Sequence, residues 1–174
     1  MTDLAERLTA FIAAQEPTAT DVRIDDLTAV SGGNARKAYS FDLVMGDKEG
    51  HLDMPCIMLM QASAGQLESD LKAEFQVISA LAGSGVPAPR ALWLDEDGRT
   101  LGAPTIVMER VPGVTDILAL RAPEPAERNR AVALAFADAA ARLHTADAGK
   151  FGFLGPRGAR QRRPSRSLSG RRSS

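Results

Sequence analysis

The chain has 174 residues, and 44% of them are apolar, so it is long enough to bury one sizeable hydrophobic core. No apolar run approaches the roughly 20 residues that span a bilayer, and the N-terminus does not resemble a secretion signal. The single cysteine, Cys56, and the two separated histidines exclude an internal disulfide and a Cys/His zinc site. We therefore expect a cytoplasmic protein with no membrane partner.

The formal charge of −1 hides a very uneven distribution. Before Lys150 the chain carries 13 basic and 22 acidic residues, a net charge of −9, whereas the last 25 residues carry +8. Of the 20 residues from 155 to 174, 18 are Arg, Ser, Gly, Pro or Ala. Such a segment cannot bury enough surface to offset its ordering entropy, so we expect a disordered basic tail.

Apolar residues at three- and four-residue spacing predict a first helix over residues 2–15, which Pro17 ends. The segments that favour strands are 22–24, 27–30, 38–44 and 56–60, and the last is apolar enough to be buried. A glycine-rich turn at 31–36 separates the second segment from the third. Residues 46–53 are expected to form a polar connection.

The stretch from Glu74 to Glu109 predicts a hairpin docked on one helix. The helix is expected to open at Ser69 or Asp70, and glycines at 83 and 85 end it. Two prolines then hold the backbone extended. The strands are expected at 90–94 and 105–109, with a turn at 95–98.

A loop through Pro125 and an alanine-rich helix at 127–144 complete the ordered part. The apolar residues that repeat along one side of this helix are Val132, Ala135, Phe136, Ala139 and Leu143. This side must pack on the rest of the chain, pair with another copy, or stay in water. We therefore expect self-association through the alanine-rich helix.

The glycine-rich turn suits a phosphate-binding role, since glycine allows the backbone N–H groups to approach anionic oxygens closely. Arg36 or Lys37 would add positive charge. The same residues also suit an ordinary hairpin turn. The segment is neither a Walker A loop nor a dinucleotide-binding fingerprint.

Taken together, the order of these segments resembles the aminoglycoside phosphotransferase-like kinases, including the kinase-like regions attached to some acyl-CoA dehydrogenases. The stretches that carry the resemblance are Ser-Gly-Gly-Asn-Ala-Arg at 31–36, Tyr-Ser-Phe-Asp at 39–42, Glu-Phe-Gln-Val-Ile at 74–78, Gly-Val-Pro-Ala-Pro-Arg at 85–90, Leu-Gly-Ala-Pro at 101–104, Val-Met-Glu-Arg-Val-Pro-Gly at 107–113 and Ala-Arg-Leu-His at 141–144. The match covers roughly residues 4–154.

The resemblance implies an α+β fold. Residues 1–113 would form a kinase-like N-lobe with a small antiparallel sheet and one crossing helix. Residues 114–154 would form a linker and the start of a C-lobe, and 155–174 the tail. The resemblance also assigns the nucleotide-binding residues: Gly32, Gly33, Asn34, Ala35 and Arg36 over the ATP phosphates, Glu74 as partner of a strand Lys or Arg, and a hinge with Met108, Glu109 and Val111 against adenine.

Two departures from the family pattern stand out. The basic residue of the strand before the Glu74 helix falls on Leu59, or on Met60 if the register slips by one. No Lys or Arg lies between Lys48 and Lys72, so Glu74 would lose its partner unless Arg36 or Lys37 substitutes.

The second departure concerns catalysis. The family needs a His-x-Asp loop, an Asn and a later Asp for Mg²⁺ beyond the alanine-rich helix. The last acidic residue here is Asp147, so we assign no catalytic residue and no Mg²⁺ ligand. A frameshift near Gly155 would explain the abrupt change in composition, and a functional basic arm is the competing interpretation.

We therefore expect an ATP-dependent phosphotransferase acting on a small-molecule hydroxyl, inactive as this chain alone. One alternative is a non-catalytic nucleotide-binding or interaction module. Another is a basic-tailed nucleic-acid binder, which is disfavoured because no aromatic residue follows Phe153 to stack on bases.

Overall fold

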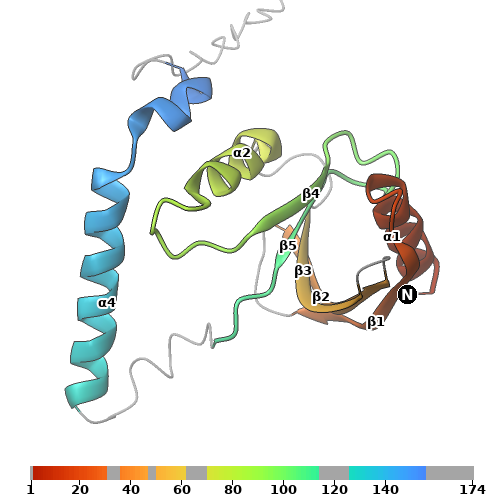
Figure 1. Cartoon of the computed structure of the whole chain (residues 1–174), viewed down its shortest axis with the longest axis horizontal. Coiled ribbons are helices and arrows are strands. Elements are labelled where there is room, and N and C mark those ends of the chain that lie inside the picture. The colour runs from red at the N-terminus through yellow and green to blue at the C-terminus, as the bar shows by residue number, and fades with distance from the viewer. Residues whose placement is uncertain (1, 31–35, 47–49, 62–69, 114–125, 156–174) are drawn as a thin grey trace, which may run out of the picture.

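The computed structural model describes residues 2–30, 36–46, 50–61, 70–113 and 126–155. Within these ranges the chain is α+β, as the sequence predicts. Its elements in chain order are α1 (Thr2–Gln15), β1 (Thr20–Val30), β2 (Arg36–Gly46), β3 (His51–Gln61), α2 (Leu71–Leu81), β4 (Ala91–Asp95), β5 (Thr105–Glu109), α4 (Ala126–Thr145) and the short 3-10 helix η1 (Ala148–Leu154) (Figure 1).

The five strands form one antiparallel sheet in the order β1-β2-β3-β5-β4. The ladder between β2 and β3 is continuous, from the Arg36–Gln61 pair to the Gly46–His51 pair. On its other side β3 pairs with β5, where Cys56 lies opposite Glu109. Figure 1 shows α1 against the β1–β2 end of the sheet and α2 near β4 and β5, with α4 farther out.

Two hydrophobic clusters lie on opposite faces of the sheet, because successive side chains of a strand point to opposite sides. On the face that α1 covers, the buried residues include Leu8, Phe11, Ile12, Phe41, Leu43, Cys56, Met58 and Met60. On the face near α2, the cluster contains Leu71, Ile106 and Met108 with the partly buried Ile57, Leu59, Phe75, Ile78 and Leu94. We call these the α1 face and the α2 face.

Several sequence predictions are confirmed in detail. The first helix covers the predicted residues, and Asp70 caps α2 by accepting a hydrogen bond of 2.9 Å from the Ala73 N–H. Gly83 and Gly85 follow α2 with φ of 70° and 79°, a conformation that glycine adopts without strain. The predicted hairpin is the β4–β5 pair, and it contacts α2.

Other boundaries were wrong. The predicted segments 22–24 and 27–30 are one strand, β1, whose ladder with β2 has two register shifts. The predicted connection 46–53 is too long, because β2 reaches Gly46 and β3 begins at His51. Ladder hydrogen bonds join backbone groups, so they extend through polar residues that hydrophobicity patterns assign to loops. The first part of the predicted linker, 114–125, and the tail from 156 fall outside the described residues.

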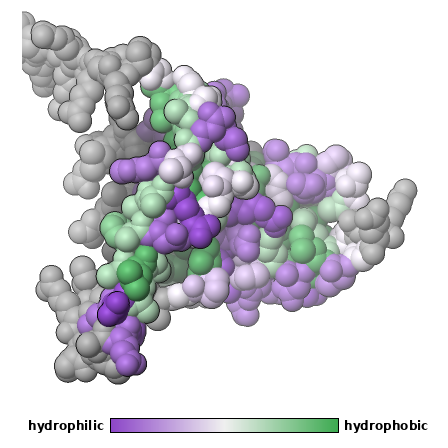
Figure 2. Space-filling model, turned by 60° about the vertical axis from the view of Figure 1, so that its left-hand side comes forward, coloured by the Kyte–Doolittle hydropathy of each residue, from purple (hydrophilic) through white to green (hydrophobic). Residues whose placement is uncertain are grey.

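The helix α4 confirms the predicted alanine-rich helix and leaves apolar side chains in water. Phe136 is 76% exposed and Leu134 is 60% exposed. Figure 2, which brings this side of the molecule forward, shows hydrophobic surface here. The Arg142 guanidinium donates a 3.3 Å hydrogen bond to the Gly85 carbonyl, and η1 contacts α2.

In the part of the chain that the structure describes, no helix combines the length and the apolar character needed to cross a bilayer.

Truncating a buried and an exposed phenylalanine should have very different effects on the free energy of unfolding. Phe41 is fully buried, so Phe41→Ala should lower the free energy of unfolding by about 3–5 kcal/mol. Phe136→Ala is the matched control and should change it by less than about 0.5 kcal/mol. Urea titration followed by circular dichroism measures both. Equal losses would contradict the assigned burial.

Candidate functional site

The side chains of Arg36 and Glu74 form a bidentate ion pair across the α2 face. Nη1 of Arg36 donates to Oε1 of Glu74 at 2.7 Å, and Nη2 donates to Oε2 at 2.5 Å. Both side chains are partly buried, with 21% and 33% of their surface exposed. Two parallel charge-assisted bonds of this kind fix the orientation of both groups as well as their distance.

The local sequence explains where each member of the pair lies. Asp70 caps α2, so Glu74 falls in its first turn, where the helix dipole favours a carboxylate. Arg36 is the first residue of β2, directly after the glycine-rich segment. In the ladder, Ala38 lies opposite Leu59, and Arg36 precedes Ala38 by two positions. Arg36 therefore shares the α2 face with Leu59.

The Glu74 carboxylate raises the pKa of the Arg36 guanidinium above its usual value. The hydrogen bond is the larger cause and the charge of the carboxylate adds to it, while partial burial acts in the opposite direction. Arg36 therefore carries its charge at every physiological pH.

Glu74 keeps a partner, because Arg36, one of the two substitutes considered from the sequence, pairs with it. Leu59, at the position where the family pattern has a cation, packs beside α2 as an apolar residue. Met60, the alternative position, is on the α1 face and 9% exposed. The cation that pairs with Glu74 comes instead from Arg36 on the neighbouring strand. Lys37, the other substitute considered, lies opposite Met60 and so belongs to the α1 face.

The predicted hinge follows β5 and is tied to the sheet on both sides. The Glu109 N–H donates to the Arg90 carbonyl, and the Arg110 N–H donates to the Pro55 carbonyl, both at 2.9 Å. Met108 is 6% exposed in the α2-face cluster, whereas Val111 is 61% exposed. Among the described residues, no backbone group pairs with the Val111 N–H.

The Arg110 side chain adds a second tie, which sequence reasoning missed. Its Nη2 donates to Oδ1 of Asp42 at 2.9 Å, and Asp42 is the ladder partner of Pro55. Arg110 thus contacts both members of one cross-strand pair, one through its backbone and one through its side chain. No sequence signal indicates this contact, because it depends on the register between β2 and β3.

Cys56 is fully buried behind the hinge, with Asp42, Arg90, Glu109 and Arg110 around it. Burial is the largest cause that raises the pKa of its thiol from 9.0 to about 12. A thiol held protonated in this way is a poor nucleophile, so Cys56 has a structural role.

Of the predicted site residues, the structure brings Arg36 and Glu74 together and places Met108, Glu109 and Val111 at the end of β5. Gly32, Gly33, Asn34 and Ala35 lie outside the described residues. Within the described ranges, no three His, Cys, Asp or Glu side chains gather as metal ligands.

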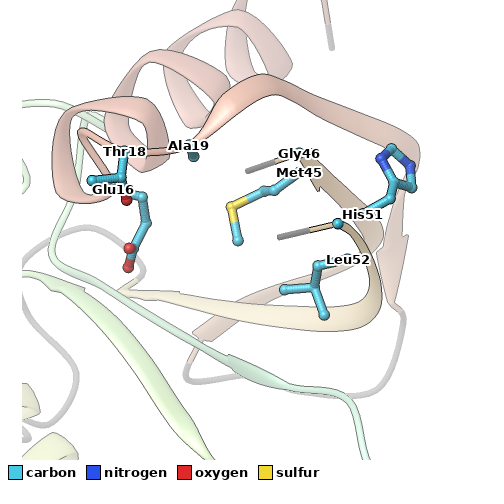
Figure 3. Close-up of a pocket in the computed structure, with 8 residues that line it drawn as sticks. Glu16, Thr18, Ala19, Met45, Gly46, His51 and Leu52 are labelled. Atoms are coloured by element: carbon cyan, nitrogen blue, oxygen red, sulfur yellow. The ribbon is translucent and has the colours of Figure 1, made fainter. Parts of the chain in front are cut away.

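A hollow of about 260 Å³ lies elsewhere, between the end of α1, the last residues of β2 and the first residues of β3. Figure 3 shows Met45, Leu52 and Glu16 around it, with His51 at its edge. The Glu16 carboxylate already accepts a 3.0 Å hydrogen bond from the Trp93 indole. Met45 follows Arg36 by an odd number of positions, so the hollow is on the α1 face and separate from the ion pair.

Comparison with known proteins points to one family. The model of the phosphotransferase enzyme family matches residues 43–173. Acyl-CoA dehydrogenase family member 10 of Mus musculus is 36% identical over 78 residues, which are 44% of this chain and 7% of the mouse protein. The crystal structure of a candidate aminoglycoside phosphotransferase from Ralstonia eutropha JMP134 matches with a TM-score of 0.54 and 24% identity, over 84% of this chain and 40% of that one.

The structural match confirms the predicted fold, a kinase-like N-lobe with its antiparallel sheet and crossing helix. The chain spans less than half the length of both relatives. The family match begins at residue 43, after Arg36, so the pairing of Arg36 with Glu74 is a finding of the structure alone.

Cys56 should make stability depend on alkaline pH. Its folded pKa of about 12 lies above the ordinary 9.0, so the folded state keeps the proton longer. The thiol's contribution is complete below pH 9 and is lost as the pH rises toward 12. Relative to Cys56→Ala, the free energy of unfolding should fall by up to about 1.4 kcal/mol per pH unit in this window. Urea titrations from pH 8 to 11 measure the difference, and parallel curves would contradict it.

Proposed function

Because the chain belongs to the phosphotransferase enzyme family, we propose that it forms the nucleotide-binding lobe of an enzyme that transfers a phosphoryl group from ATP to a hydroxyl of a small molecule. The observation that carries the proposal is the ion pair between Glu74 of α2 and Arg36 at the start of β2. Phosphoryl transfer depends mainly on positioning and on neutralising phosphate charge. A guanidinium that a helix carboxylate orients, on the residue directly after the glycine-rich segment, suits both tasks.

The hinge supports the adenine end of the proposed site. The N–H groups of Glu109 and Arg110 are used within the sheet, which leaves the backbone N–H of the exposed residue Val111 to bond the adenine ring. Pro55, which anchors the hinge, and Gln61, which lies opposite Arg36, are six positions apart in β3. At about 3.3 Å per residue they are separated by roughly 20 Å, so an extended nucleotide would lie along β3.

In this proposal the phosphates lie under Gly32, Gly33, Asn34, Ala35 and Arg36, and adenine lies beside Met108. On the α2 face between them, Ala38, Ser40 and Ile57 are only partly buried.

The family's Mg²⁺ does not fit the residues at hand. The described side chains offer no cluster of ligands for it, and the sequence has no acidic residue after Asp147. Among the described residues of this lobe, none is therefore assigned as a Mg²⁺ ligand or as a catalytic base. We propose that these 174 residues by themselves bind ATP without turning it over. The acceptor hydroxyl would bind to regions of the enzyme outside this lobe.

A proline at the hinge tests the proposed adenine site. Val111→Pro removes the backbone N–H, whereas the matched control Val111→Ala keeps it. An unmade hydrogen bond at a buried donor or acceptor costs about 1–3 kcal/mol, so Val111→Pro should weaken ATP binding by about 5- to 150-fold. Val111→Ala should bind within about twofold of the unaltered chain, since its N–H remains. Isothermal titration calorimetry measures the three dissociation constants.

Two results would count against the proposal. If the unaltered chain shows no saturable ATP binding, the nucleotide-binding function is wrong. If the proline and alanine variants bind ATP equally, the hinge assignment is wrong.

We also propose that the apolar side of α4 pairs with a second copy of the chain, since Val132, Phe136 and Leu143 share this side and are 46%, 76% and 48% exposed. Multi-angle light scattering over a concentration series should show mass rising with concentration. Phe136→Asp should abolish the rise, because it places a charge in the apolar contact. Asn129→Asp adds the same charge at an exposed position of α4 and should not. A constant monomer mass for the unaltered chain would refute self-association.

A further inference from the structure

We propose that Arg36 is the phosphate-binding cation of this lobe, in place of the basic residue that the family pattern puts in the strand before α2. The proposal rests on the nucleotide-binding function proposed above. It concerns which strand supplies the positive charge, and the geometry points to β2 instead of β3.

The strand β3 contains no Lys or Arg. The position expected to be basic is Leu59, which is partly buried with Phe75 and Ile78 of α2. No Lys or Arg occurs between Lys48 and Lys72, so neighbouring registers of β3 do not supply one either.

Arg36 is on the correct face and close enough. Ala38 lies opposite Leu59, and Arg36 lies two residues earlier, so the two positions are diagonal neighbours on the α2 face. Diagonal neighbours in an antiparallel pair have Cα atoms about 7–8 Å apart, a span that a long arginine side chain covers. The guanidinium reaches Glu74, as the missing strand cation would.

The adjacent basic residue, Lys37, cannot take the place of Arg36 beside Glu74. Lys37 lies opposite Met60, whose side chain is buried on the α1 face, and Lys37 itself is exposed. A one-residue step along a strand moves the side chain to the other side of the sheet. Of the two basic residues after the glycine-rich segment, only Arg36 therefore lies on the face of Glu74.

The guanidinium of Arg36 is suited to bind a phosphate and a carboxylate together. A guanidinium carries five N–H donors in a planar fork, so it can bond more than one acceptor at a time, and here it already forms a bidentate pair with Glu74. The fork can therefore hold a carboxylate on one edge and a phosphate oxygen on another. Glu74 acts here as a positioning residue for Arg36, and the phosphate contact belongs to Arg36.

The test compares ATP with adenosine, which shares the base and sugar but has no phosphates. Arg36→Met in the full chain should weaken ATP binding by about tenfold or more, because a charge-assisted contact is lost. It should leave the dissociation constant of adenosine within about twofold, since adenosine makes no phosphate contact. Lys37→Met, the matched control, should bind both ligands like the unaltered chain. Calorimetry measures each constant.

A double variant that moves the positive charge from β2 to β3 tests whether the charge itself binds the phosphates. Arg36→Met combined with Leu59→Lys returns a cation to the family position within reach of Glu74, and should recover part of the lost ATP affinity. Arg36→Lys keeps the charge in β2 and should also retain more affinity than Arg36→Met. If lysine at position 59 prevents folding, the double variant will also lose adenosine binding. Arg36→Lys then shows by itself whether the positive charge is what binds the phosphates.

The outcomes separate this inference from the function on which it rests. If the unaltered chain binds neither ATP nor adenosine, both are overturned. If it binds ATP and Arg36→Met binds ATP as tightly, the function stands and the inference is wrong. If Arg36→Met weakens ATP and adenosine equally, Arg36 has only a structural role and the inference is also wrong.

Discussion

The apolar packing of β3 on both faces, complete on the α1 face and partial on the α2 face, is the constraint on which the arrangement of charges depends. Met58 is fully buried on the α1 face, and Leu59 packs beneath α2 on the other. A charged side chain in the middle of such a strand would lose its hydration, which is costly without a partner of opposite charge. The cations that bear on the proposed site therefore flank β3, with Arg36 on β2 and Arg110 after β5.

The ion pair between Arg36 and Glu74 also connects two parts of the fold that are distant in sequence. It joins the start of β2 to the first turn of α2, 38 residues later. Apolar contacts from Leu71, Phe75 and Ile78 hold α2 near the sheet without specifying its rotation closely. Two parallel hydrogen bonds are directional, so the pair holds the Glu74 side of the helix toward the start of β2.

Toward the other end of β3, a second arginine, Arg110, connects the hinge to the sheet. Arg110 contacts the Asp42–Pro55 pair through both its backbone and its side chain. These contacts anchor Arg110, and the next residue, Val111, is 61% exposed. A binding surface with both ends fixed to a rigid sheet needs little ordering when a ligand arrives, which favours affinity.

The sequence by itself determined the elements whose signals are local: the periodicity of α1 and α4, the Asp70 cap of α2, and the glycines that end α2. The resemblance added Glu74 and the hinge. Only the tertiary structure decided which cation meets Glu74, since Arg36 and Lys37 are adjacent and both basic. Strand side chains alternate between faces, so the choice depends on the β2–β3 register, which exists only once residues far apart in the chain have paired.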